Sequence, residues 1–137
     1  AWIAMPSDPK LHQNLELVAD TYLSVTTPIQ SAATGWLAER QNFQAPVRDR
    51  CRANLELLQN SLRNTPWSLN QPEAGWVAIL HGPSHIEEED FALRLLAEGV
   101  SIQPGYFYDL PIQPCFVISL LTQVDHLRAG LRIILSA

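Results

Sequence analysis

The sequence is poor in basic residues. It has a single lysine, Lys10, and eight arginines against 14 acidic residues, which gives a net charge of -5 over 137 residues. A surface that binds nucleic-acid phosphates needs clustered lysine and arginine. Only Arg48, Arg50 and Arg52 lie close together, and on a helix they spread over more than one face as a solvated surface. We therefore expect no nucleic-acid partner.

Cysteines and long hydrophobic runs are also scarce. Cys51 and Cys115 are the only cysteines, too few for a disulfide framework, so we expect free thiols in a reducing cytoplasm. No apolar run approaches membrane-spanning length and no signal peptide opens the sequence, which predicts no membrane partner. Hydrophobic residues make up 47% and charged residues 17%, a composition typical of a globular domain.

The first part of the sequence reads as one strand and three helices. Ala1 to Met5 is an apolar run that fits a buried strand. It begins without an initiating methionine, from which we expect that something upstream has been removed. Helices are predicted from Pro9, capped by Ser7 or Asp8, from Ile29 to about Glu39, and from near Pro46 to before Pro66. The predicted inward residues of these helices are, in order, Leu11, Leu15, Val18 and Tyr22; Ile29, Ala32, Ala33, Trp36 and Leu37; and Val47, Cys51, Leu55, Leu58 and Leu62.

The second part alternates between strand and helix patterns. We expect strands over 75–80, 100–103 and 115–121, with a turn at 104–105. A capping box of Ser84 and Glu87 predicts a helix that ends at Gly99, and a last amphipathic helix carries Val124, Leu127, Leu131 and Ile134. The predicted fold class is therefore α+β, with a small antiparallel or mixed sheet packed against helices and preceded by long helices.

The order of these motifs resembles the small, C-terminal domain of fold-type I pyridoxal-phosphate (PLP) aminotransferases of the aspartate-aminotransferase type, class I/II. Residues 72–77, PEAGWV, are similar to the family's entry into a small-domain strand. Residues 99–108, GVSIQPGYFY, resemble the family stretch "gly-val-x-val-x-pro-gly-x-x-phe", with Tyr108 at the last aromatic position. Residues 116–120, FVISL, and a final helix then close the chain, as in the family. Thr27 to Ala33 resembles the segment that leads into the helices joining the two domains.

The resemblance implies a parent enzyme that moves an amino group between an amino acid and a 2-oxo acid. In this family a lysine forms an imine with PLP, which serves as an electron sink. The residues that hold PLP would lie before Ala1, so we expect no catalytic or cofactor-binding residue here, no PLP bound to this chain alone, and no activity without the missing large domain. Residues 1–24 would then be a remnant of that large domain and residues 25–137 the small domain. The resemblance also implies a cytoplasmic homodimer.

The resemblance also points to residues that line the substrate. Tyr106, Phe107 and Tyr108 match a loop at the mouth of the family's active site, although ordinary core and rim aromatics remain an equal alternative. Val117 stands where the family has an arginine that binds the substrate carboxylate in a bidentate manner. Another arginine substitutes for it, or the substrate is unusual, or the alignment is shifted by a few residues.

Two other interpretations compete with this one. The residues His81, His85 and Glu87 to Asp90 suggest a metal site, but no ligand spacing stands out, so we expect no metal. The stronger alternative is a free-standing, non-catalytic α+β module for binding or dimerisation, which would equally lack a catalytic lysine.

Overall fold

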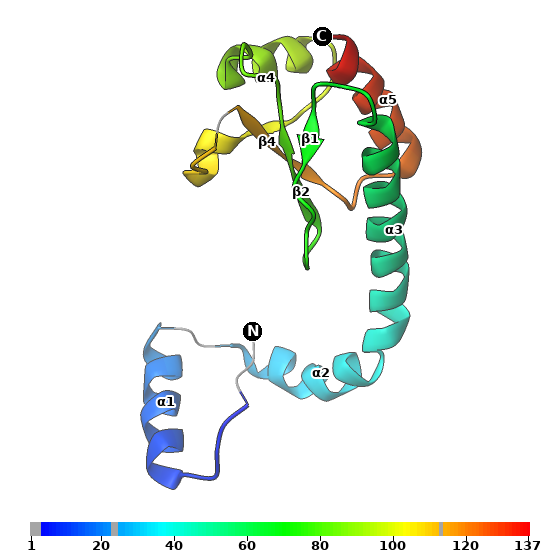
Figure 1. Cartoon of the computed structure of the whole chain (residues 1–137). Coiled ribbons are helices and arrows are strands. Elements are labelled where there is room, and N and C mark those ends of the chain that lie inside the picture. The colour runs from blue at the N-terminus through cyan, green and yellow to red at the C-terminus, as the bar shows by residue number, and fades with distance from the viewer. Residues whose placement is uncertain (1–3, 23–24, 113) are drawn as a thin grey trace. The chain divides into compact units, whose positions relative to one another are not determined.

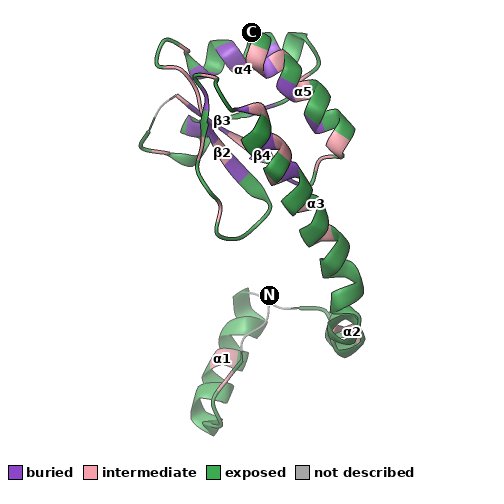
Figure 2. Ribbon diagram, turned by 45° about the vertical axis from the view of Figure 1, so that its right-hand side comes forward, coloured by how far each residue is buried: buried purple, intermediate pink, exposed green. Residues whose placement is uncertain are grey.

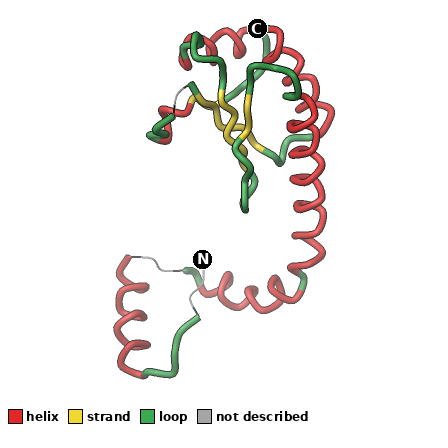
Figure 3. The backbone as a smooth tube through the Cα atoms, viewed as in Figure 1, coloured by secondary structure: helices red, strands yellow, loops and turns green. Residues whose placement is uncertain are grey.

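The computed structural model describes residues 4–22, 25–112 and 114–137. By its internal packing the chain divides into two compact units, residues 1–43 and 44–137. Figure 3 shows that the first unit contains helices and loops, whereas the strands lie in the second. Each unit is described by itself below.

The first unit contains α1 (Pro9–Tyr22) and α2 (Thr27–Ala38). The Asp8 side chain caps α1, since its Oδ1 accepts hydrogen bonds from the backbone N–H groups of Lys10 at 2.9 Å and Leu11 at 3.4 Å. Pro28 lies in the first turn of α2, where a missing N–H costs no helical hydrogen bond. Both helices were predicted. Of the strand predicted over residues 1–5, residues 1–3 lie outside the described residues, and Ala4 and Met5 are not in a strand.

The apolar stripes of α1 and α2 are not buried within the first unit, so the inward placement predicted for the α2 residues is wrong there. Neither helix contains a buried residue, and Figure 2 shows almost the whole unit as exposed. On α2, Trp36 is 58% exposed. Two short helices offer too little surface to enclose a core, because the fraction of surface that a chain buries is smaller for shorter chains. Their apolar spacing is therefore real, but it describes a face that the described residues leave uncovered.

The long helix α3 (Arg40–Ser61) crosses the boundary between the units. It begins earlier than predicted, so Pro46 lies inside the helix and not near its first turn. The proline removes one hydrogen bond there, but the rest of the helix continues to Ser61. Its last turns carry the buried residues Asn54 and Leu58. The predicted stripe through Leu58 and Leu62 is confirmed, with Cys51 and Leu55 packed against the core.

The second unit is built on a small antiparallel sheet (Figure 1). Its strands are β1 (Ser68–Leu69), β2 (Val77–His81), β3 (Gln103–Pro104) and β4 (Cys115–Ser119), in the spatial order β1-β2-β4-β3. The central pair, β2 and β4, aligns Val77 with Ser119 and His81 with Cys115. This sheet, with α4 (Glu88–Ala97) and α5 (Val124–Ser136), confirms the predicted α+β class. The two-residue strand β1 was not predicted, because so short a segment has no alternating pattern.

One face of the sheet forms the core of this unit. Ala78, Leu80, Phe116 and Ile118 point to the same side and pack with the apolar residues of α3, α4 and α5. Trp67, Phe91 and Phe116 form an aromatic cluster whose ring centroids lie 5.3–5.9 Å apart. On α5, Leu127, Leu131 and Ile134 are buried, as their helical spacing predicts.

Helix α4 ends as predicted but begins differently. The predicted capping box with Ser84 is wrong, because residues 83–86 form a turn in which the Ile86 N–H donates to the Pro83 carbonyl. Glu87 is the N-cap instead, and its side chain accepts from the Asp90 N–H at 3.0 Å. At the other end, Gly99 has a φ of +82° and its N–H donates to Leu96, completing the left-handed cap that favours glycine.

The strand predicted over residues 100–103 is shorter than expected. The Val100 N–H donates to the Leu95 carbonyl at 2.8 Å as part of the α4 cap, so it cannot join a sheet ladder. Pairing begins only at Gln103. The predicted turn at 104–105 is likewise replaced, because Gly105–Tyr108 forms a 3₁₀ helix, η1.

Candidate functional site

The face of the sheet that lies opposite the core is open and carries no arginine or lysine. Because side chains alternate along a strand, the pairing register places one set of β2 and β4 residues on this face. Gln103 of β3 joins them, since it pairs with Val117. The residues on this open face are Val77, Ile79, His81, Gln103, Cys115, Val117 and Ser119. Val77, Gln103 and Ser119 are exposed, whereas Cys115 is buried where η1 packs on the start of β4. A substrate carboxylate at this face would therefore meet no guanidinium or ammonium group from these strands.

Val117 lies at the centre of this open face. It is half-buried and aligned between Ile79 of β2 and Gln103 of β3. The Tyr108 hydroxyl of η1 donates to Oε1 of Gln103. This contact leaves the amide N–H₂ of Gln103 available as a donor. The structure thus places two of the predicted site residues next to the same side chain: Val117 pairs with Gln103 in the sheet, and Tyr108 of η1 donates a hydrogen bond to it.

The three predicted aromatic residues all belong to η1. Tyr106 and Phe107 meet edge to face with their ring centroids 4.8 Å apart. Their exposed fractions are 40% and 62%, and Tyr108 is 50% exposed. They are therefore not core residues of the part of the chain that the structure describes. Their exposure excludes the core interpretation and is equally expected of residues that line the active-site mouth and of ordinary rim aromatics.

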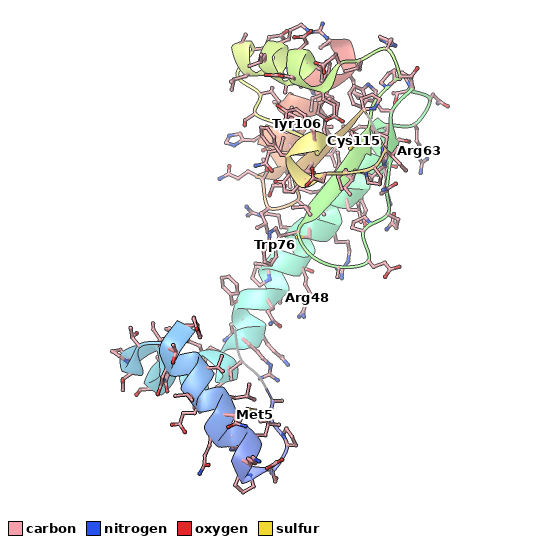
Figure 4. The ribbon with its side chains drawn as sticks, turned by 90° about the vertical axis from the view of Figure 1, so that its left-hand side faces the viewer. Met5, Arg48, Arg63, Trp76, Tyr106 and Cys115 are labelled. Carbon is pink, nitrogen blue, oxygen red and sulfur yellow. The ribbon has the colours of Figure 1, made fainter. Side chains whose placement is uncertain are left out.

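A buried carboxylate, Glu88, holds η1 in place. Its Oε2 accepts from the Tyr106 N–H at 3.0 Å, and its Oε1 accepts from the Cys115 N–H at 2.7 Å. Figure 4 shows Tyr106 on η1 and Cys115 at the start of β4, on neighbouring segments. The sequence interpretation missed Glu88, because it lies in a run of four acidic residues at a helix start. Its spacing to the buried Phe91 and Leu95 of α4 is the signal that could have identified it.

Burial and negative charge raise two pKa values beside Glu88. Burial raises the pKa of the Cys115 thiol above its ordinary value, and the Glu88 carboxylate raises it further by repelling the thiolate. Desolvation raises the pKa of Tyr106 as well, and Glu89, Glu87 and Glu88 contribute in the same direction. Both groups are therefore neutral near pH 7. A raised thiol pKa also disfavours Cys115 as a nucleophile.

A groove of about 660 Å³ lies beside β4 and α5. Val117, Gln103, Trp76, Val100 and His126 are among the residues that line it. Its volume suits a ligand of small-molecule size. Among the described residues, the aromatics of η1 do not line this groove. Gln103 thus contacts both Val117 and Tyr108, but Val117 and the aromatic residues of η1 do not line the same groove.

The groups that could hold PLP or a metal ion are few among the described residues. The only lysine, Lys10, is exposed on α1 in the first unit, so the second unit has no amine that could form an imine. Over the residues described, no group of three or more histidines, cysteines, aspartates and glutamates is placed to hold a metal ion. A search of the same residues for a helix long and apolar enough to cross a membrane also found none.

Comparison with protein families identifies the chain. The family model for aminotransferase class I and II matches residues 1–132. That match covers nearly all of the sequence, and the chain therefore belongs to the class I and II aminotransferase family. The resemblance inferred from the sequence motifs is confirmed. A comparison with curated proteins gave no match.

Solved structures show the same fold. The aspartate aminotransferase from Rhizobium meliloti matches with a TM-score of 0.71 and 21% identity, over 93% of this chain and 35% of its own. YbdL from Escherichia coli, which has a methionine aminotransferase function, matches with a TM-score of 0.65 and 23% identity, over 93% of this chain and 33% of its own. The α-aminoadipate aminotransferase LysN from Thermus thermophilus, complexed with N-(5′-phosphopyridoxyl)-L-leucine, matches with a TM-score of 0.62 and 20% identity, over 94% of this chain and 37% of its own. The chain spans about a third of the length of these relatives.

Proposed function

We propose that this chain is the C-terminal part of a PLP-dependent aminotransferase that moves an amino group between an amino acid and a 2-oxo acid. The observation that carries the proposal is the family match over residues 1–132. The coverage of about a third of each solved relative supports the view that further segments complete the enzyme. The chain alone is expected to be inactive.

In this proposal the cofactor is held outside the chain. PLP, when bound, supplies the electron sink for the reaction, and the binding of a phosphopyridoxyl compound by LysN supports PLP as the cofactor. Residues 1–24 would belong to the large PLP-binding domain and residues 25–137 to the small domain. The complete enzyme would be a cytoplasmic homodimer. Tyr106, Phe107, Tyr108 and Val117 would contribute the part of the substrate site that this chain supplies.

The first experiment is to read the coding DNA upstream of the Ala1 codon and to express the complete open frame. We expect a lysine encoded shortly before Ala1, an imine absorption band when PLP is added, and loss of that band with borohydride. We also expect amino transfer from a panel of amino acids to a 2-oxo acid. The matched control is residues 1–137 alone, which should give neither band nor transfer. A start codon at or just before Ala1 would contradict the proposal.

Substrate choice is proposed to depend on Val117. The open face offers no guanidinium at this position, so another arginine binds the substrate carboxylate, or the substrate is unusual, or the alignment to the family is shifted by a few residues. In the complete enzyme, Val117→Arg should lower KM for the amino acid, and Val117→Leu is the control of similar polarity. If both variants behave like the parent, Val117 does not face the substrate.

A second candidate function is a free-standing binding or dimerisation module. The apolar stripe of α1 supports it, since Val18 and Tyr22, one turn apart on the helix, are 47% and 79% exposed, and exposed apolar patches often mark interaction sites. Residues 1–137 are expected to self-associate with rising concentration under either proposal, as measured by light scattering, because the missing large domain would otherwise cover this surface; imine formation with PLP by the complete protein distinguishes the two. The double variant Val18→Ser and Tyr22→Ser should weaken that association. A chain that remains monomeric at high concentration would count against this alternative.

A further inference from the structure

Glu88 is an unusual residue for the interior of this unit. It is only 4% exposed, whereas its neighbours Glu87, Glu89 and Asp90 lie at the surface. A carboxylate is expensive to bury unless hydrogen bonds replace its water. The ion pairs found among the described residues, Arg52–Asp49 and Arg128–Asp125, are exposed pairs on other helices. The compensation for Glu88 must therefore come from other groups.

Backbone amides supply that compensation, one to each carboxylate oxygen. The two donors, Tyr106 and Cys115, belong to different elements: Tyr106 is in η1 and Cys115 begins β4. Glu88 is also the first residue of α4, where the helix dipole favours a negative charge. One side chain thus joins the start of a helix, the aromatic turn and the central strand of the sheet.

The packing beside these bonds leaves little freedom. A Cβ at Gly105 would lie 2.1 Å from the Sγ of Cys115 and 3.3 Å from Oε1 of Glu88. Gly105 precedes Tyr106, so the turn approaches β4 and the carboxylate at the same place. The hydrogen bonds and the close approach therefore fix the same short segment, from which the three aromatic side chains project.

We propose that Glu88 is a positioning residue, whose carboxylate fixes η1 against β4 and thereby sets where Tyr106, Phe107 and Tyr108 stand beside the open face. For the reaction, this inference rests on the proposed aminotransferase function. Glu88 touches no substrate in this scheme and acts only through the aromatic turn. The two bonds to its carboxylate are the feature to be tested.

The test is Glu88→Gln in the complete protein that carries this chain, with Glu89→Gln as the matched control. An amide of the same shape has only one acceptor oxygen, so it can accept from one of the two N–H groups. We expect hydrogen exchange at the Tyr106 or the Cys115 amide to become about tenfold faster or more, because a bond to a charged acceptor is lost. Amides of α5 should be unchanged, as should all amides in Glu89→Gln. Glu88→Ala, if it folds, should accelerate both amides.

The second readout is kinetic and separates positioning from simple stability. In Glu88→Gln we expect KM for the amino acid to rise about tenfold, equivalent to one weakened hydrogen bond, with kcat nearly unchanged. Unchanged exchange at both amides, or an equal effect of Glu89→Gln, would overturn the proposal. So would faster exchange without any change in KM. If the parent protein shows no amino transfer at all, the proposed function fails, while the exchange measurement still decides whether Glu88 fixes η1.

Discussion

Replacing Gly105 with alanine tests how closely η1 packs on β4. The alanine Cβ would lie 2.1 Å from the Sγ of Cys115 and 3.0 Å from its carbonyl oxygen. Carbon and sulfur atoms in contact normally sit at about 3.5–4.0 Å or more, so one of the two segments must shift by roughly 1.5 Å. The φ of Gly105 is not in the left-handed region, so the backbone itself would tolerate alanine. The expected damage is therefore steric.

Overpacking of this kind costs about 1–3 kcal/mol of the free energy of unfolding. Gly130 of α5 provides a matched control in the same unit, because a Cβ there would meet Val100 at an ordinary 3.7 Å. Gly130→Ala should be neutral or stabilising by up to about 1 kcal/mol, since alanine favours a helix. Equilibrium unfolding in urea, followed by tryptophan fluorescence, measures both changes; Trp36 and Trp76 are already exposed in the folded state and should change less than Trp67. Trp67 is a suitable reporter because it is buried in the aromatic cluster.

A double-mutant cycle with Cys115→Ala identifies the atom responsible. Removing Sγ removes the shortest contact. In that background Gly105→Ala should lower the free energy of unfolding by no more than about 0.5 kcal/mol, because only the contact with the carbonyl oxygen of residue 115 remains strained. The coupling between the two sites should thus be about 1–2 kcal/mol. An equal cost of Gly105→Ala in both backgrounds would refute the steric explanation. So would a Gly105→Ala protein that is as stable as Gly130→Ala.

The remaining predictions concern three other positions. Asn54→Ala should lower the free energy of unfolding by about 2–4 kcal/mol in a urea titration, since the buried amide donates to two carbonyls after β4, at 2.8 and 2.7 Å; a cost below about 1 kcal/mol would contradict this. Because the Cys115 thiol has a raised pKa in the folded state, its contribution to stability is complete below the ordinary thiol pKa and is lost as the pH rises through the raised value. In urea titrations at increasing alkaline pH, the free energy of unfolding should therefore fall more steeply with pH for the parent than for Cys115→Ala. The same dependence on pH in both proteins would contradict this prediction. Gly99→Ala should lower the free energy of unfolding by about 1–2 kcal/mol, because the left-handed φ of this residue disfavours alanine. No atom lies within 4 Å of the new Cβ, so the effect is not steric, and thermal unfolding at neutral pH would measure it.

The elements that the sequence predicts well are those with a one-sided apolar pattern. Leu127, Leu131 and Ile134 recur at helical spacing and are buried on α5. Gly99 marks the end of α4 because few other residues adopt its φ. Local patterns fail where a tertiary contact decides. On α2, Trp36 has the spacing of a buried residue, yet the described residues leave it exposed.

The start of α4 shows why one local rule can displace another. Ser84 and Glu87 have the spacing of a capping box, but Pro83 begins a turn whose hydrogen bond includes Ile86. Glu87 then becomes the N-cap and the helix starts at Glu88. Glu88 lies on the same helix face as Phe91 with either start, so the buried carboxylate was missed because it stands in an acidic run and not because the helix start was mispredicted.

The candidate site illustrates the remaining limit, which is register. The resemblance to the family points to Tyr108 through residues 99–108 and to Val117 through its aligned strand position, but it does not say which residues lie next to them. That follows from the pairing of Gln103 with Val117, which depends on how α4 ends and where β3 can begin. A slip of one residue would turn Val117 towards the core, because neighbouring strand residues face opposite sides. The apolar residues Phe116 and Ile118 prevent that slip, since both are buried on the other face. The neutral character of the open face at Val117 is thus fixed by the same core packing that holds the sheet.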